Sequence, residues 1–415
     1  MTQMKRYLIL MTAAALVAAC SNDADEVESG YVPSNDAIVF DATEDNGTGT
    51  RAAGEINDVT ALRATSFGVF ASYTGRETYE NATVSSDFMH NQQVTYSSSV
   101  WTYAPVKYWP NNGDENISFF AYAPYEATPK DDGRCITDMS KREDLGDPWI
   151  NFHLPEKPWG EYNTSDKKYE NPEQIDLLYG VNGATNKPWF DQRKANYNVS
   201  QKMIFTFHHA LACVGDEITI KLSSDLSTLI DGYAKIYIQK LTIDYTNLTT
   251  KGRLVLNSNT TPNWKEVISG EVTTTRTLEL NYDEVAGALT GDLFPDAVKP
   301  DYTSADNTGR LTYYGAHTGI TATKTTISTG KGLFYIPLQV KGMDAARADL
   351  TLEYQVINNI GEAYEGTATG SFLLDMNIDG KKQGIDITLN KDFKLGVLVY
   401  EIGDGATEPS YSRKR

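Results

Sequence analysis

The sequence predicts an all-β protein that folds as two β-sandwich domains in tandem. Residues 350–356 alternate strictly between apolar and polar side chains, which is typical of a strand with one buried face. The 25 tyrosines and 32 glycines suit strands joined by turns, whereas helical periodicity is scarce. At 415 residues the chain exceeds what one hydrophobic core usually serves, so two domains are expected.

Residues 1–19 are expected to be a signal peptide. Lys5 and Arg6 give a short positive region, and residues 7–16 follow as an apolar stretch that only Thr12 interrupts. This stretch is too short for a permanent membrane-spanning helix but has the length of a secretory signal.

Residues 17–20, Val-Ala-Ala-Cys, resemble a bacterial lipobox, in which small side chains precede the cleaved bond and a cysteine thiol receives a diacylglycerol. Each buried methylene group contributes about 0.8 kcal/mol, so two or more acyl chains would anchor the protein durably. The alternative is an ordinary secretory signal with an incidental cysteine. We predict lipidation of Cys20, followed by a flexible acidic tether over residues 20–36.

Several segments after the tether show the alternation of strands. Apolar side chains share one face at Phe67, Val69, Ala71 and Tyr73, and again at Ile385, Ile387 and Leu389. In another segment Ile236 and Ile238 are in one phase and Leu241, Ile243 and Tyr245 in the other. A strand that continues through residues 239–240 therefore needs a bulge to keep its apolar side chains on one face. One short helix is expected at 226–230, capped from residues 223–225.

The expected domains are an N-terminal sandwich over residues 37–267 and a C-terminal sandwich over residues 268–402, followed by a polar tail at 403–415. Residues 126–175 mix Pro, Gly, Asp and Lys with few apolar runs, so they are expected to form a loop insertion in the first sandwich. Residues 296–330, rich in Thr, Gly and Asp, are expected to be a loop in the second.

The chain is acidic, with 55 Asp and Glu residues against 37 Lys and Arg and a net charge of −18. Such a chain has no electrostatic attraction for nucleic acid, and we predict no nucleic-acid partner. With Cys20 lipidated, Cys135 and Cys213 remain. They either pair in an oxidising compartment or stay as two buried thiols.

No catalytic, metal-binding or cofactor-binding motif stands out, so we predict a non-enzyme without a cofactor or metal. Adjacent residues of a strand point to opposite faces, so His208 and His209 are expected to be one buried and one exposed rather than joint metal ligands. The aromatic run that contains Trp101 and Trp109 has two interpretations. It either fills the end of a sandwich, which we favour, or exposes Trp101 and Trp109 to stack on a glycan.

Several motifs occur in an order and spacing that resembles the fimbrillin family, the type V pilins and related lipoproteins. They are the lipobox and the segments at 37–41, 50–52, 67–70, 101–110, 117–125 and 205–212, with looser matches at 333–337 and 380–401. The resemblance implies two transthyretin-like β-sandwiches in tandem. It also implies export to the outer membrane and cell surface through acylated Cys20, and a place in a fimbria with a host or bacterial surface receptor as a further partner.

The resemblance further implies assembly with other fimbrial subunits by β-strand addition. In this scheme an arginine-specific protease removes the first strand, and a strand from another subunit fills the vacancy. Carried onto this chain, the displaceable strand consists of Ala37, Ile38, Val39, Phe40 and Asp41, and Arg51 is the processing site. The alternatives are that Arg51 is a plain loop arginine, or that Arg63 is cut instead.

The C-terminus departs from the family pattern, in which stalk subunits carry additional strand-forming sequence that they donate. Here residues 396–402 are apolar on both faces and are expected to end the second sandwich, and only a short polar tail follows. This favours a tip, anchor or accessory subunit over a stalk subunit. The alternative is that residues 395–402 are themselves the donor strand. Outside the fimbrial interpretation, the remaining alternative is a monomeric glycan-binding surface lipoprotein.

Overall fold

In the computed structural model of the chain, the described residues form four larger β-sheets and one two-stranded hairpin, which confirms the all-β fold class. The structure describes residues 36–44, 56, 58–130, 135–163, 168–196, 202–267, 270, 272–281, 318–358, 362–376 and 382–402. The predicted signal peptide at 1–19, Cys20, the tether up to residue 35, Arg51 and the tail at 403–415 lie outside these ranges.

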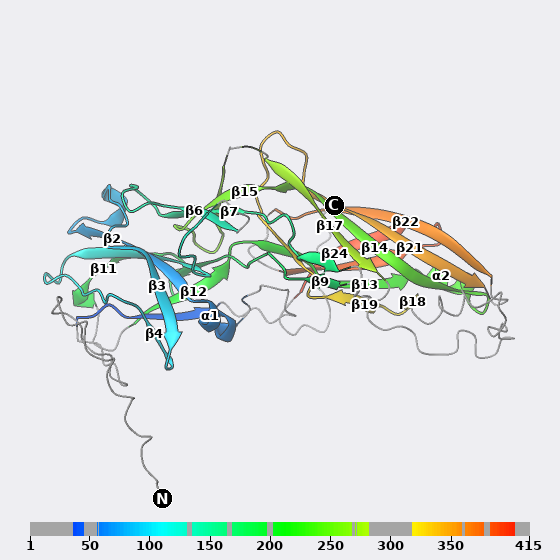
Figure 1. The fold of residues 1–415 in the computed structure, drawn as a ribbon, viewed down its shortest axis with the longest axis horizontal. Coiled ribbons are helices and arrows are strands. Elements are labelled where there is room, and N and C mark those ends of the chain that lie inside the picture. Colours follow the sequence, from blue (N-terminus) through cyan, green and yellow to red (C-terminus); the bar gives the residue numbers. More distant parts are fainter. Residues whose placement is uncertain are drawn as a thin grey trace, which may run out of the picture.

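The first sheet occupies one end of an elongated molecule (Figure 1). Its strands follow the order β1 (Phe40–Glu44), β12 (Met203–His209), β10 (Leu178–Asn182), β5 (Asn116–Ala123), β2 (Phe67–Gly75), β3 (Met89–Ser97) and β4 (Val100–Thr102), and β11 (Trp189–Gln192) also pairs with β5. The sheet curls so far that its two end strands, β1 and β4, contact each other. Helix α1 (Val59–Thr65) packs against β1 and β3.

A second sheet covers one face of the first. Its order is β16 (Asn263–Glu266), β15 (Lys251–Val255), β7 (Trp149–His153) and β6 (Ile136–Met139). Phe70 and Phe120 of the first sheet pack into one core cluster with Phe152 of β7, whereas Phe67 and Phe119 point into a different cluster on the opposite face. The prediction of one solvated face is therefore wrong for the strand that contains Phe67, because both of its faces are covered.

The predicted loop insertion at 126–175 is wrong in part, because it supplies β6 and β7 of the second sheet. The alternation that forms β7 is short but present in the sequence: Ile150 and Phe152 are buried, and the residues between and beside them are half-buried. The same region contains the hairpin of β8 (Glu161–Asn163) and β9 (Lys168–Glu170).

The third and fourth sheets pack face to face at the other end of the molecule and enclose the largest core cluster. The third sheet has the order β19 (Thr325–Thr329), β13 (Ala212–Leu222), β23 (Lys382–Leu389) and β24 (Leu395–Glu401), and β20 (Leu333–Tyr335) also pairs with β13. The fourth has the order β17 (Thr273–Asn281), β14 (Ala234–Thr249), β21 (Arg347–Asn358) and β22 (Ala363–Leu373), and β18 (Thr318–Ile320) also pairs with β14. Strands β18 and β19 lie in the predicted loop at 296–330.

The sheets do not follow the predicted boundary between residues 267 and 268. Strands β13 and β14 pair with strands from the C-terminal half, and the chain then returns through β15 and β16 to the second sheet. Their apolar side chains, such as Ile220 and Ile243, belong to the core between the third and fourth sheets. The physical reason is that a strand joins the sheet whose core its apolar face completes, whatever its place in the sequence.

Two local predictions are confirmed. The register of β14 against β21 shifts between Ile238 and Lys240, and Ile238 and Leu241 are both fully buried on either side of this bulge. Helix α2 (Ser224–Ile230) is capped by the Ser223 hydroxyl, which accepts from the Leu226 N–H. Within the described residues, no helix has the length and hydropathy needed to cross a membrane.

Candidate functional site

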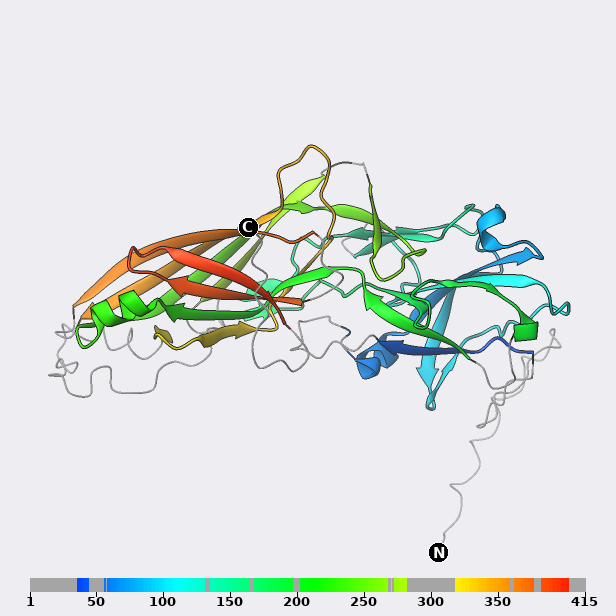
Figure 2. The ribbon, with the colours of Figure 1, turned by 180° about the vertical axis from the view of Figure 1, so that it is seen from behind.

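Strand β1 forms one end of the first sheet and pairs in parallel with β12 (Figure 2). The register runs from Phe40 opposite Met203 to Glu44 opposite Phe207, and the Met203 N–H donates to the Val39 carbonyl at 2.9 Å. The strand therefore overlaps the predicted displaceable segment at Phe40 and Asp41 but continues three residues beyond it.

The first residues of the predicted segment bind elsewhere. Ala37 forms an isolated bridge with Tyr108, and the Ile38 N–H donates to the Lys107 carbonyl at 2.9 Å. The Tyr103 hydroxyl donates to the Ile38 carbonyl at 2.8 Å. The segment that leads into β1 is thus held from one side by residues 103–109, and β1 itself is held from the other side by β12.

The inward face of this segment is apolar. Ile38 and Phe40 are 1% exposed and Ala42 is 3% exposed, because alternate residues of a strand point to the same face. The Phe40 ring lies 5.3–6.5 Å from the rings of four other aromatic residues, with T-shaped or tilted geometry. These residues are Phe67, Tyr103, Phe119 and Phe205.

The ion pairs on the outward face of this segment are accessible to solvent. The Lys202 ammonium donates to the Asp41 carboxylate at 3.1 Å, and Lys194 donates to Asp36 at 2.8 Å. Exposed ion pairs of this kind contribute about 0–1 kcal/mol each. The attachment of β1 to the molecule therefore depends on its apolar face and its backbone pairing with β12.

An anchor follows the undescribed segment that contains Arg51. Ile56 is 2% exposed, and its N–H donates to Oδ2 of Asp176 at 3.1 Å. The Asp176 side chain is fully buried and lies 2.8 Å from Nδ1 of His209. Helix α1 starts three residues later at Val59, and the preceding residue, Asp58, caps it by accepting from the Ala61 N–H at 2.7 Å. The chain is thus fixed immediately downstream of the predicted processing site.

Sequence reasoning missed this anchor. Ile56 and Asp176 are 120 residues apart and neither lies in a recognisable motif. The one available signal was an isolated isoleucine in a polar stretch, which is too common to indicate a buried contact.

Taken together, β1 is an end strand with one strand partner, an apolar inner face and weak polar contacts on its outer face. Its removal would leave one edge of β12 without its backbone partner and would uncover Phe67, Phe119 and Phe205. A vacancy of this kind can accept an extended segment that restores both the hydrogen bonds and the apolar contacts.

Trp101 and Trp109 belong to the core that β1 covers, so the interpretation of exposed glycan contacts is contradicted. They are only 6% and 4% exposed. The ring of Trp101 lies 4.9 Å from that of Phe67, and the ring of Trp109 lies 6.0 Å from that of Phe119. Trp101 and Trp109 therefore act as core residues, whose side chains fill the inner space of the curled sheet.

The prediction for the adjacent histidines is wrong in detail. Both His208 and His209 are half-buried: His209 pairs with Asp176, and the ring of His208 lies 5.7 Å from that of Tyr179. In the part of the chain that the structure describes, no cluster of three or more His, Cys, Asp or Glu side chains could hold a metal ion.

Cys135 and Cys213 are both buried and are not bonded to each other. They lie in the core cluster between the first and second sheets. The Cys135 thiol donates to the Glu173 carbonyl at 3.3 Å, and burial raises the pKa of this thiol to about 12.

Native Cys135 is expected to react with iodoacetamide at pH 8 about a thousandfold more slowly than in the unfolded chain, because only the thiolate reacts and its fraction falls tenfold for each pKa unit above the pH. Raising the pH toward 10 should accelerate labelling of the native chain, since more of the thiol then ionises. Peptide mass mapping of labelled chains, folded and in denaturant, measures this. Equal labelling rates in the two states would contradict the buried position.

Comparisons with known proteins support the observed fold and indicate one family. The model of the fimbrillin-like family matches residues 50–402. Fimbrium subunit Fim1C of Phocaeicola vulgatus is 26% identical over 254 residues, which covers 60% of this chain and 59% of that protein. The match therefore spans less than two thirds of that relative's length. The crystal structure of a fimbrial protein from Bacteroides vulgatus has the same fold, with a TM-score of 0.61 and 21% identity over 89% of this chain and 99% of that chain.

Proposed function

The chain belongs to the fimbrillin-like family, and from that premise we propose that it is a surface subunit of a fimbria, of structural or adhesive type, that joins other subunits by β-strand exchange at the β1 edge. Arginine-directed cleavage at Arg51 would separate β1 from the rest of the chain. A strand from another subunit would then take its place beside β12.

The position of β1 is the observation that carries this proposal. A strand in the middle of a sheet pairs with a strand on each side, whereas among the described residues β1 pairs with β12 alone, and on the other side only the preceding residues Ala37 and Ile38 bind residues 107–108. The linker that contains Arg51 joins β1 to the anchor at Ile56, so a cut at Arg51 frees the strand on one side and leaves α1 attached on the other.

The energetics make strand replacement more favourable than an empty slot. Burial of Ile38 and of Phe40 contributes about 1.5–3 kcal/mol each, and each backbone hydrogen bond adds about 0.5–1.5 kcal/mol. Loss of β1 forfeits these contributions and exposes an aromatic surface to water. An incoming strand with apolar residues at alternate positions recovers them.

Export as a lipoprotein belongs to the same proposal. The lipobox that ends in Cys20, and the acidic residues after it, support acylation and surface display at the outer membrane. The acyl chains would hold the unprocessed subunit at the membrane until cleavage releases it into the growing fimbria.

The pairing of β24 argues against its use as a donor strand. Strand β24 pairs with β23 along its whole length, and its Leu395 and Tyr400 are buried. A donor strand has to leave its own subunit to fill another, and β24 is already part of the third sheet.

The substitution Arg51→Ala tests the processing step. When the lipidated full chain is incubated with an arginine-specific protease, the wild-type chain should yield a product that begins at Ala52 and should enter SDS-resistant, high-mass assemblies. The Arg51→Ala chain should lose both outcomes by at least about tenfold, because strand exchange requires the vacancy. N-terminal sequencing and unboiled SDS gels measure the two outcomes.

Arg63→Ala is the matched control. Arg63 lies in helix α1 with its guanidinium 4.4 Å from the centre of the Tyr96 ring, a conformation that does not fit the extended binding mode of a protease. It should therefore leave processing and assembly unchanged. Unchanged processing of Arg51→Ala would refute the assignment of Arg51, and assembly of uncleaved chains would refute cleavage-dependent exchange.

A further inference from the structure

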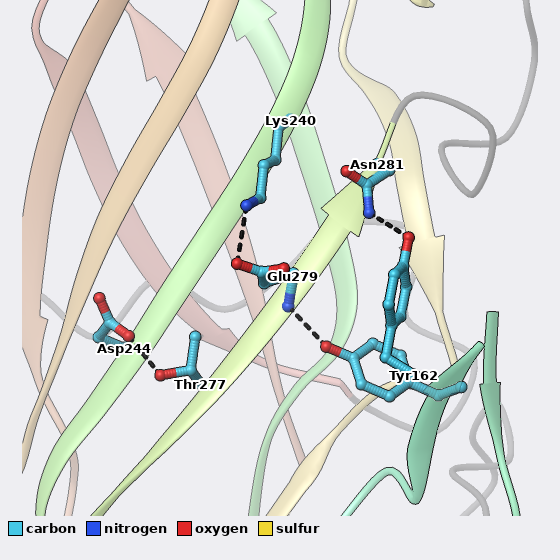
Figure 3. Close-up of polar contacts among 7 residues, drawn as sticks. Tyr162, Lys240, Asp244, Thr277, Glu279 and Asn281 are labelled. Atoms are coloured by element: carbon cyan, nitrogen blue, oxygen red, sulfur yellow. Dashed lines mark hydrogen bonds and ion pairs between the residues drawn. The ribbon is translucent and has the colours of Figure 1, made fainter. Parts of the chain in front are cut away.

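The fourth sheet has two edge strands, β17 and β22, and another element of the fold covers the edge of β17. The β8–β9 hairpin lies beside it (Figure 3). The Tyr169 hydroxyl accepts from the Glu279 backbone N–H at 3.0 Å, and the Tyr162 hydroxyl accepts from the side-chain amide of Asn281. Covering an edge in this way prevents another strand from pairing with it.

The opposite edge is β22, and among the described residues no strand pairs with its outer side. The strand has 11 residues and pairs with β21 without a register shift. It contains no proline, no lysine and no bulge, which are the usual devices that block edge pairing. Figure 2 shows β22 in orange along the outer rim of its end of the molecule. A long, regular and unblocked edge favours pairing with another strand.

Hydrogen bonds at both ends of the β21–β22 pair show which backbone groups of β22 face outward. The Asn358 N–H donates to the Glu362 carbonyl at 3.0 Å, and the Leu374 N–H donates to the Ala346 carbonyl at 2.9 Å. Because bonding direction alternates along an antiparallel strand, the even-numbered residues of β22 bond to β21. The odd-numbered residues, which include Thr367 and Thr369, therefore present their N–H and carbonyl groups at the outer edge.

The sequence of β22 is nearly symmetric about Ala368. Residues 365–371 read Glu-Gly-Thr-Ala-Thr-Gly-Ser, so the two sides of Ala368 match in reverse order except for Glu365 and Ser371. We propose that β22 pairs antiparallel with β22 of a second copy of this chain, with the two-fold axis at Ala368. Such a contact is self-complementary, as a two-fold interface requires.

This register gives each side chain a suitable partner. Thr367 lies opposite Thr369 of the second copy in a hydrogen-bonded pair, and Glu365 lies opposite Ser371 rather than another carboxylate. Tyr364, which is 57% exposed, lies opposite Phe372, and the 68% exposed Leu373 at the end of the strand gains a cross-strand neighbour. Aromatic pairs and like-charge avoidance both stabilise cross-strand contacts.

The central glycines are compatible with the pairing. A side chain at Gly366 would collide with the Tyr354 ring at 2.4 Å, and one at Gly370 would collide with Leu395 at 2.8 Å. The molecule's own residues thus fill the inner face at these positions, and the second copy needs to supply only backbone there. This dimer contact is at the opposite end of the molecule from β1, so it does not depend on the proposed strand exchange.

Disulfide trapping tests the register. In full-length chains that carry Cys20→Ser, Thr367→Cys in one preparation and Thr369→Cys in another are mixed under mild oxidation in detergent. Hydrogen-bonded pairs have Cα atoms about 5.5 Å apart, within the range for a disulfide. The mixture should form a covalent dimer at least about tenfold faster than either variant alone, since identical positions are then more than about 7 Å apart. Equal rates in all three samples would overturn the proposed register.

The backbone substitution Thr369→Pro tests the contact itself. It removes an outward N–H while the bonds to β21 are retained, and Thr369→Ser is the matched control. Sedimentation velocity should show a concentration-dependent dimer for wild type and Thr369→Ser, and a dissociation constant raised at least about tenfold for Thr369→Pro, because each lost bond occurs twice in the interface. Unchanged thermal unfolding shows that Thr369→Pro remains folded. A wild-type chain that stays monomeric, or a dimer insensitive to this substitution, would overturn the proposal.

Discussion

Phe40→Ala is expected to lower the free energy of unfolding by about 3–5 kcal/mol, the usual cost of truncating a buried phenylalanine. The ring of Phe40 is at the centre of the aromatic cluster under β1, in contact with Phe67, Phe119 and Phe205. Strand β1 cannot move into the cavity that alanine leaves, because its backbone pairing with β12 fixes its position relative to the core. Urea denaturation followed by tryptophan fluorescence measures the change.

Asp41→Ala is the matched control, because Asp41 is the next residue of β1 but faces outward. Its ion pair with Lys202 is exposed, so its loss should change the free energy of unfolding by less than about 1 kcal/mol. If the two substitutions cost the same, the apolar face is not what holds β1, and a vacancy would have no reason to attract another strand.

The fold class and several local features could be predicted because they depend on neighbouring residues. The phase change between Ile238 and Leu241 required a bulge in any sheet, and the structure has it. The cap of α2 at Ser223 follows from the same kind of local chemistry. The family resemblance indicated a first strand at residues 37–41, although the end of this strand at Glu44 was not visible in the sequence.

The arrangement of the sheets could not be predicted, because it depends on which cores the strands complete. Phe70 and Phe67 are both buried, and their pattern alone does not reveal that a second sheet covers the face of Phe70. The same limit applies to β13 and β14, whose apolar faces fit the core of the C-terminal sheets as well as any other. Alternation shows that a face is buried but not what buries it.

The candidate site likewise combines features that the sequence could predict with features that depend on tertiary packing. The tryptophans of the run at 101–110 were predicted to be either core or exposed, and only packing against Phe67 and Phe119 decides for the core. Position at the end of a sheet is also a tertiary property. The sequence suggested that residues 37–41 form a strand, but only the structure shows that, among the described residues, β12 is the one strand that pairs with β1.

Asp176→Ala is expected to lower the free energy of unfolding by about 3 kcal/mol, because it removes a buried carboxylate that accepts two hydrogen bonds, one of them from a histidine. Asp176 is fully buried, and its carboxylate accepts hydrogen bonds from the Ile56 N–H and from Nδ1 of His209. Asp176→Asn preserves the shape and one acceptor oxygen, so it should cost less than alanine. Urea denaturation of both variants measures the difference.

Asp176→Ala also tests whether the Ile56 anchor restricts cleavage to Arg51, so that β1 is removed and α1 is retained. If Ile56 is released, α1 loses its fixed entry, and the arginine-specific protease should then also cut at Arg63 within the helix. The wild-type chain should resist this second cut, because Leu62 is fully buried and Asp58 caps the helix. If Asp176→Ala neither destabilises the chain nor exposes Arg63, α1 is held by other contacts. The proposed division between a removable strand and a retained helix would then need a different physical basis.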